Sequence, residues 1–232
     1  MKPTRALVAM IVFGIAAPAM QNGVVIDHLI LGIDDLDRGI ADFEGMTGVR
    51  PVIGGVHPGR GTRNALVSLG EGVYLEIIAP DPKQSVESDM VRELKPLMTL
   101  TPVGWAVGTD DLFSLQAKLQ AREIRHGAAM PGSRALPDGS RLQWSTTEVT
   151  LPQHNWMPFF IKWSDPAKHP SRTSPSGCSL TSAEIQDPNP DPLTHVFSAI
   201  RLKVPAKRGE ASRMTIRLKC PKGRVTFQGS AS

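Results

Sequence analysis

Residues 29–36 read LILGIDDL, and residues 105–112, 76 positions later, read WAVGTDDL. Both segments keep a glycine, two aspartates and a leucine in the same order. In each copy an apolar run typical of a buried strand leads into a segment typical of a helix, and an aspartate stands where the helix needs an N-cap. A repeat of this length predicts two similar modules packed together, with a cleft between them as the natural place for chemistry.

The residues around each copy predict the same order of elements, a strand, a helix and three strands. In the first module, residues 24–80, apolar runs and glycine turns predict strands near 24–31, 50–53, 63–68 and 73–78. The second module, residues 102–165, repeats this order, and residues 178–229 predict a partial strand–helix–strand–strand addition. The expected fold class is α+β, with two βαβββ modules and a partial C-terminal βαββ addition.

Residues 1–19 have the pattern of a secretory signal peptide. Lys2 and Arg5 form a basic start, residues 6–16 are apolar, and Ala-Pro-Ala follows at 17–19 as a small-residue cleavage site. An uncleaved N-terminal anchor is the alternative, although the apolar run is short for a membrane span. We therefore expect a periplasmic or secreted protein.

The charge and apolar content of the remaining chain bound its partners. Without Lys2 and Arg5 the formal charge falls from +4 to +2, and no basic run alternates with aromatic residues as a nucleic-acid surface requires. No later segment is apolar for long enough to span a membrane. We expect a small-molecule ligand, no nucleic acid and no membrane association after signal removal, and a homodimer stays open as an alternative to a monomer.

The chain has two cysteines, Cys178 and Cys220. An oxidising compartment outside the cytoplasm would allow them to form a disulfide. The sequence does not show whether their Cβ atoms face each other, so pairing stays open here.

His28 and Glu76 are the first candidates for chemistry. His28 lies on the first expected strand, and Glu76 lies between apolar neighbours on the fourth. Burying a carboxylate there is unfavourable unless it is paired or bound to a metal. If the sheet curls so that these strands are adjacent, an imidazole and a carboxylate could converge on a divalent cation. The alternative is a buried hydrogen-bonded pair.

The segment His57-Pro58-Gly59-Arg60-Gly61-Thr62-Arg63-Asn64 is the second candidate. Flanking glycines let the backbone approach a ligand, and Arg60 could then bind a carboxylate or phosphate with both arms of its guanidinium. Thr62 and Asn64 add hydrogen-bonding groups, and Asn64 stands where a strand favours a β-branched residue. A tight surface loop with a solvated arginine is the alternative.

The tryptophans cluster in the second module, where most alternate with apolar residues as core positions do. Trp105 differs, because it neighbours Gly104, the position equivalent to His28 in the repeat. We therefore expect Trp105 to form a wall of the cleft.

Two spaced motifs resemble the first module of the vicinal oxygen chelate superfamily, which includes glyoxalase I, extradiol dioxygenases and fosfomycin-resistance proteins. They are VIDHL at 25–29 and YLEI at 74–77. The segments HPGRGTRN at 57–64 and PFFIKW at 158–163 resemble, more narrowly, its glyoxalase-like domain branch. The resemblance covers roughly residues 24–200.

This resemblance implies a divalent metal ion, with Zn, Mn, Fe and Ni not distinguished. His28 and Glu76 match the metal ligands of the first module. The second module should offer a His or Gln near Gly104 and a Glu near Ile161, and it offers neither. If a metal binds, the first module therefore holds it and the second shapes the pocket.

A third ligand would then come from a loop. The candidates are His57, His154 and His169, and the predicted ligand set is His28, Glu76 and His57. A site that has lost its metal and binds a small molecule in the same cleft is an equal alternative.

The resemblance also implies a class of activity. We expect a glyoxalase-like enzyme acting on a small carbonyl or oxygen-rich compound, with Glu76 moving a proton next to the carbonyl, by lyase, isomerase or dioxygenase-like chemistry. The competing interpretation is a non-catalytic small-molecule-binding or resistance protein of the same fold.

Overall fold

The computed structural model describes residues 24–135, 139–151 and 156–230. The expected signal peptide at 1–19 lies outside these residues. Within the described part of the chain, no helix is both long enough and apolar enough to cross a membrane.

The two modules have the expected element order. The first consists of β1 (Val25–Gly32), α1 (Leu36–Thr47), β2 (Val52–His57), β3 (Thr62–Ser68) and β4 (Tyr74–Pro80). The second consists of β5 (Thr101–Gly108), α3 (Leu112–Gln120), β6 (Met130–Ala135), β7 (Arg141–Glu148) and β8 (Phe159–Trp163). The repeated aspartates begin both helices: Asp35 accepts from the Arg38 backbone N–H and Asp111 from that of Ser114.

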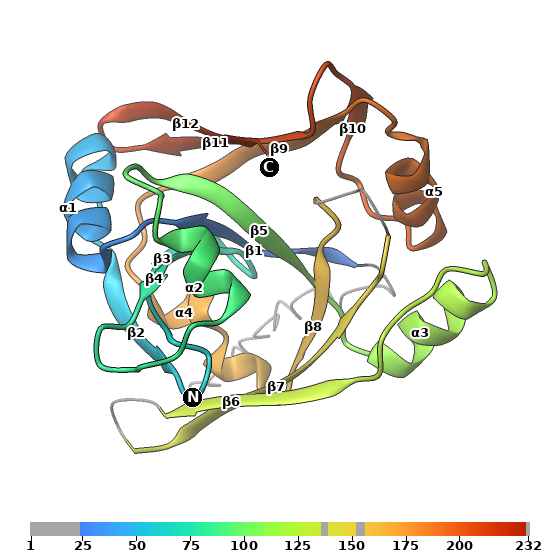
Figure 1. Cartoon of the computed structure of the whole chain (residues 1–232), viewed down its shortest axis with the longest axis horizontal. Helices are drawn as coiled ribbons and strands as arrows, with labels where there is room; N and C mark the ends of the chain where they lie inside the picture. Colours follow the sequence, from blue (N-terminus) through green and yellow to red (C-terminus); the bar gives the residue numbers. More distant parts are fainter. Residues whose placement is uncertain (1–23, 136–138, 152–155, 231–232) are drawn as a thin grey trace, which may run out of the picture.

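All eight strands of the modules form one sheet, in the order β2-β3-β4-β1-β5-β8-β7-β6. The first strands of the modules, β1 and β5, pair antiparallel at its centre, and each is parallel to the last strand of its own module. Each module thus has the same strand order outward from the centre of the sheet: first strand, fourth, third and second. The edge strands β2 and β6 contact each other, so the sheet curls into a cup (Figure 1).

The two faces of this sheet differ in chemistry because successive side chains of a strand point to opposite faces. One face carries Leu29, Leu75 and Phe160 into the main hydrophobic core. The inner face of the cup carries His28 and Glu76, which are also buried. The alternation along β1 and β4 therefore places both candidate groups on the same side.

The connection between the modules contains a short helix that the sequence analysis does not predict, α2 (Asp89–Leu94). Its Leu94 packs against Ile30 and Ile78 on the inner face, beside the candidate groups. After β8 the chain forms the 3₁₀ turn η1 (Pro166–Lys168) and the short helix α4 (Pro170–Thr173).

The C-terminal part forms a second sheet, in the order β10-β9-β11-β12. Its elements are β9 (Ser179–Asp187), α5 (Asp191–Ala199), β10 (Ala206–Arg208), β11 (Arg213–Cys220) and β12 (Gly223–Ser230). The edge strand β10 has three residues and adds one strand to the expected addition. In Figure 1 this sheet lies along one side of the molecule, where β11 and β12 contact β5 and β12 also contacts α1.

Cys178 and Cys220 form a disulfide, which answers the question that the sequence left open. The bond joins the residue before β9 to the last residue of β11, and both side chains are buried at the edge of the core. The disulfide therefore fixes the second sheet at the end nearest α1.

Reduction of this disulfide should destabilise the protein. Its cysteines are 42 residues apart in the sequence, and cross-links of this length stabilise folded proteins by about 2–4 kcal/mol. Urea unfolding with and without reductant measures the difference, and the Cys178→Ala, Cys220→Ala double variant should show the same loss without reductant. An unchanged unfolding midpoint under reduction would contradict this expectation.

Candidate functional site

A β-bulge in β1 brings Asp27 and His28 to the same side of the sheet. The register between β1 and β5 shifts between Ile26 and His28, so Asp27 is the extra residue. Gly108 on β5 leaves room for its carboxylate, because a Cβ added to this glycine would lie 3.1 Å from Asp27 Oδ2. A larger residue at this glycine of the second repeat would therefore have to displace the Asp27 carboxylate by a few tenths of an ångström.

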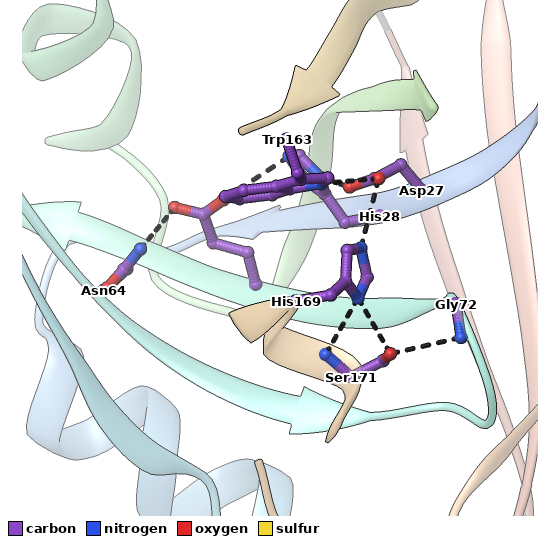
Figure 2. A network of polar contacts seen from close by, with 8 residues as sticks. Asp27, His28, Asn64, Gly72, Trp163, His169 and Ser171 are labelled. Atoms are coloured by element: carbon purple, nitrogen blue, oxygen red, sulfur yellow. Dashed lines mark hydrogen bonds and ion pairs between the residues drawn. The ribbon is translucent and has the colours of Figure 1, made fainter. Parts of the chain in front are cut away.

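Three side chains donate hydrogen bonds to the buried carboxylate of Asp27 (Figure 2). His28 Nδ1 lies 2.7 Å from Oδ1, while Trp163 Nε1 and His169 Nε2 lie 2.8 and 3.1 Å from Oδ2. Burial alone would raise the pKa of Asp27, but the hydrogen bonds from His169 and His28 lower it to about 2. Because an ionised carboxylate only accepts, His28 carries its proton on Nδ1, and in its neutral form Nε2 has a free lone pair.

His169 is itself held in one orientation by Ser171 (Figure 2). Its Nδ1 accepts from the Ser171 backbone N–H at 3.2 Å and from the Ser171 hydroxyl at 2.8 Å. The same hydroxyl accepts from the backbone N–H of Gly72 at 3.1 Å. Both ring nitrogens of His169 are thus engaged, so it lies behind His28 as an orienting group and is not a third metal ligand.

Glu76 lies opposite His28 on the inner face. His28 Nε2 is 3.7 Å from Glu76 Oε2, which is beyond hydrogen-bonding distance but leaves the two groups facing each other. Asn64 Nδ2 donates to Glu76 Oε1 at 2.8 Å and fixes the carboxylate. The buried imidazole and carboxylate therefore form a pair with one hydrogen-bonded support each.

His57 approaches the same carboxylate from β2. Its Nδ1 lies 2.8 Å from the Thr62 hydroxyl, and its Nε2 lies 3.8 Å from Glu76 Oε1 and 3.3 Å from Asn64 Nδ2. Burial lowers the pKa of His57, and the nearby arginines lower it further, against the opposing effect of Glu76. His57 is therefore neutral at physiological pH and uses its Nε2 lone pair to accept from Asn64.

Aromatic side chains form the walls around His28. Tyr74 stacks on its ring with centroids 4.6 Å apart, and Phe159 meets it edge-on at 5.4 Å. Trp163 on β8 extends this wall, and the ring centroid of Trp144 on β7 lies 5.6 Å from that of Trp163. Because burial raises the pKa of Tyr74 well above its usual value, its phenol stays protonated.

The strand register corrects the expected equivalence between the modules. Ile30 pairs with Glu76 in the first module, and the equivalent residue of the second, Ala106, pairs with Phe159. Phe159 is therefore the counterpart of Glu76, rather than Ile161. Gly104 stands at the position of His28, so the second module has no polar side chain at either of the two positions, and the Phe159 ring meets His28 edge-on instead.

The structure brings together five of the seven predicted site residues: His28, His57, Thr62, Asn64 and Glu76. Trp105 is a correction, because it pairs with Leu29 and points into the hydrophobic core, where its Nε1 donates to the Trp156 carbonyl. Arg60 is exposed in the turn between β2 and β3, at the rim of the site. The alternative ligand His154 lies outside the described residues.

Asp27 and Arg134 belong to the site although no sequence pattern points to them, and Trp163 belongs to it although its alternation with apolar residues indicates a core position. Asp27 precedes His28 directly, but a regular strand would point it to the other face, and only the bulge brings it back. Arg134 is a buried arginine on β6 whose guanidinium donates to the Gly54 carbonyl on β2. Its place beside the first module depends on the curl of the sheet, for which the sequence has no local signal.

Two hollows on the protein lie away from this cluster. One, of about 480 Å³, lies between α1 and β12, and the other, of about 470 Å³, lies beside the end of α3 and α5. None of the predicted site residues lines either of them.

The predicted metal site of His28, Glu76 and His57 is not formed in this arrangement. His28 fits a metal ligand well, since its Nδ1 is bound to a carboxylate and its Nε2 is free. His57 does not, because the Asn64 amide occupies its Nε2 lone pair and stands between it and Glu76. Among the described residues, no group of three or more His, Cys, Asp or Glu side chains could hold a metal ion.

The model of the glyoxalase-like domain family matches residues 26–200, from β1 to the end of α5. The chain belongs to this family. The fold and the family that the two motifs of the first module implied are therefore confirmed. No curated protein matches the chain.

Solved structures share the fold of this glyoxalase-like protein. A hypothetical protein from Staphylococcus aureus aligns with a TM-score of 0.63 and 15% identity, over 90% of this chain and 86% of that one. A variant of Streptomyces coelicolor methylmalonyl-CoA epimerase aligns with a TM-score of 0.43 and 20% identity, over 60% and 97%. A mutant of 4-hydroxymandelate synthase from Streptomyces coelicolor aligns with a TM-score of 0.46 and 13% identity, over 90% of this chain and 64% of that one. The first shows the likeness of fold, and the last two scores are too low to support an argument.

The low pKa of Asp27 should make stability depend on pH. Its folded-state pKa of about 2 lies below the ordinary value of 3.8, so its contribution is complete above about pH 5 and is lost as the pH falls toward 2. Urea unfolding across this range should show the difference between wild type and Asp27→Asn shrinking by about 2 kcal/mol. The exposed Asp37→Asn should show little such change, and a pH-independent effect of Asp27→Asn would contradict the assignment.

Freeing His57 should improve metal binding. In Asn64→Ala the His57 Nε2 lone pair no longer accepts from an amide, so we expect Zn²⁺ to bind about tenfold or more tightly than to wild type. Calorimetric titration measures this, with the exposed Asn189→Ala as the matched control and the added His57→Ala change removing the gain. Equal affinity in wild type and Asn64→Ala would show that Asn64 does not block the site.

Proposed function

We propose that the protein is an enzyme that moves a proton on a small carbonyl compound bound in the cup, with His28 and Glu76 as the proton-transferring groups. The observation that carries this proposal is the buried Asp27 carboxylate, which directs the His28 Nε2 lone pair toward the inner face and Glu76. A base that is held in one tautomer by a carboxylate is the arrangement that general-base catalysis requires.

The proposed step is removal of a proton from the carbon next to the carbonyl. The C–H bond breaks, its proton passes to His28 Nε2, and its electron pair moves into the carbonyl group to give an enolate. Asp27 and Glu76 flank the resulting imidazolium, and two carboxylates stabilise that charge inside the protein. The proton then passes from His28 Nε2 to Glu76 Oε2, 3.7 Å away, and Glu76 donates it to a different position or face of the enolate, which completes an isomerisation or epimerisation and leaves both groups in their starting state.

The neighbouring residues support this role by holding the two groups in place. Asn64 restrains the Glu76 carboxylate, and Tyr74 stacks on the imidazole of His28. His169 and Trp163 complete the acceptor positions of Asp27. We derive no step through a metal ion, because His57 does not complete a ligand set with His28 and Glu76.

Binding without turnover is the second candidate function. The partly exposed side chains of Trp144, Phe159 and Trp163 support it, because aromatic walls bind flat ligands without any proton transfer. The two functions share the same cup and differ in whether His28 exchanges protons with the bound compound.

We also propose that the protein acts outside the cytoplasm. The signal-peptide pattern of residues 1–19 supports this location, and so does the disulfide between Cys178 and Cys220, since disulfides persist in oxidising compartments. Detection of the mature chain in a periplasmic or culture fraction would test it.

Proton exchange tests the proposed function directly. Phenylacetone and phenylpyruvate both carry exchangeable hydrogens next to a carbonyl, and wild-type protein in D₂O should exchange them faster than buffer does, as followed by proton NMR. His28→Asn and Glu76→Gln should each lower the catalysed rate by about 100-fold or more, the range for a lost general acid or base.

The matched controls are His195→Asn and Glu71→Gln, which change exposed residues of the same types outside the cup. Both should exchange at the wild-type rate. Exchange by wild type no faster than by buffer, or equal rates in His28→Asn and wild type, would leave the non-catalytic binding function in its place.

A further inference from the structure

We propose that Arg134 forms an anion-binding subsite in the cup, so that the natural ligand is a flat apolar compound bearing a carboxylate or phosphate. This inference deepens the proposed function, because it names the class of compound that reaches His28. It rests on a residue of the second module that neither the repeat nor the motifs of the first module point to.

The position of Arg134 supports this assignment. It lies on β6 and is only 8% exposed, and its Nη1 donates to the Gly54 carbonyl on the neighbouring edge strand β2. The guanidinium also packs against the backbone at Gly55, where an added Cβ would lie 3.4 Å from Nη1, an ordinary contact distance. The guanidinium is thus held in place by one of its five N–H groups, and the others are not hydrogen-bonded to any described residue.

The charge of Arg134 lacks a direct partner among the described residues. Burial lowers the pKa of the Arg134 guanidinium, and Tyr74 and Glu76 oppose this shift. Its hydrogen bond to the Gly54 carbonyl brings it beside the site, because a Cβ added to Gly54 would overlap Asn64 Oδ1. No carboxylate of the described chain forms an ion pair with it. None of its guanidinium nitrogens is among the buried side-chain atoms of the described residues that lack a hydrogen-bond partner, so its free donors remain accessible. A bound oxyanion would pair with the charge and accept from these donors.

The walls of the cup define the rest of the ligand. Arg134 shares the inner face with Trp144, which packs over Gly132 on the same strand as Arg134. Trp144 and Trp163 are neighbours and both are partly exposed. A planar apolar group would fit against these rings while its charged end meets the guanidinium.

Two alternative roles for the arginines of the cup lead to different predictions. Arg134 could serve only to hold β2 to β6 through the Gly54 carbonyl, in which case its loss would weaken folding and leave ligand preference unchanged. Arg60, at the exposed rim, could instead be the anion-binding group, as the sequence suggested. The experiment therefore compares the two arginines and compares charged with neutral ligands.

Isothermal titration calorimetry with matched probes tests the inference. Phenylpyruvate and phenylacetone share a benzyl ketone and differ by a carboxylate in place of a methyl group, and benzyl phosphate supplies the other oxyanion. Wild type should bind phenylpyruvate, benzyl phosphate or both at least about tenfold more tightly than phenylacetone. The anion that binds more tightly shows whether the natural ligand carries a carboxylate or a phosphate.

Substitution of Arg134 should remove this preference. Arg134→Met should weaken binding of the preferred anion by about 10- to 100-fold and leave phenylacetone unchanged, whereas Arg134→Lys keeps the charge and should lose less. The exposed Arg141→Met and the rim variant Arg60→Met should both bind like wild type. If Arg134→Met does not fold, Arg134→Lys and the comparison of ligands on wild type carry the test.

Several results would overturn the inference: no binding of either anion at millimolar concentration, equal affinity of wild type for phenylpyruvate and phenylacetone, unchanged anion binding in folded Arg134→Met, or loss of binding in Arg60→Met. The outcome is separable from that of the proposed function, because benzyl phosphate has no carbonyl to enolise. Arg134-dependent binding of benzyl phosphate without any catalysed exchange would sustain this subsite and reject the proton-transfer enzyme.

Discussion

The buried carboxylate of Asp27 is the interaction on which the candidate site depends. It connects three parts of the chain, since its donors are His28 on β1, Trp163 at the end of β8 and His169 just before α4. Burying a charge is tolerated only when hydrogen bonds satisfy it, and here both oxygens are satisfied. The hydrogen bond from His28 that helps to make this burial possible also fixes the orientation of the His28 ring. Asp27 therefore contributes both to stability and to the proposed chemistry.

The two modules have the same fold but contribute different chemistry to the cup. The first supplies His28, Glu76 and the supporting Asn64, whereas the second has Gly104 and Phe159 at the equivalent positions. The apolar ring of Phe159 therefore meets the imidazole of His28 from the second module. The second module instead contributes Arg134 from its edge strand, and the curl of the sheet brings this cation to the first module.

The sequence predicts the fold well because the signals for it are local. The glycine and paired aspartates of each repeat specify a strand that ends at a capped helix, and both helices begin where the repeat places them. Alternation along β1 and β4 likewise predicts that His28 and Glu76 face the same side. These inferences need only the periodicity of a strand and the register of neighbouring strands.

The remaining features depend on long-range geometry that a single sequence does not encode locally. The bulge at Asp27 reverses the direction that simple alternation gives its side chain, and the same alternation directs Trp105 into the core although it neighbours Gly104. The hydrogen bond from Asn64 to His57 occupies the lone pair that His57 would use to bind a metal ion. No rule of residue spacing predicts this hydrogen bond.

The tautomer of His28 decides whether this histidine can act as the base that faces the cup. Long-range ¹H–¹⁵N NMR of the neutral ring reports which nitrogen carries the proton. We expect a proton on Nδ1, facing Asp27, and a lone pair on Nε2, with this preference weakened in Asp27→Asn. A proton on Nε2 in the wild-type protein would contradict it, because His28 could then not act as the base that faces the cup.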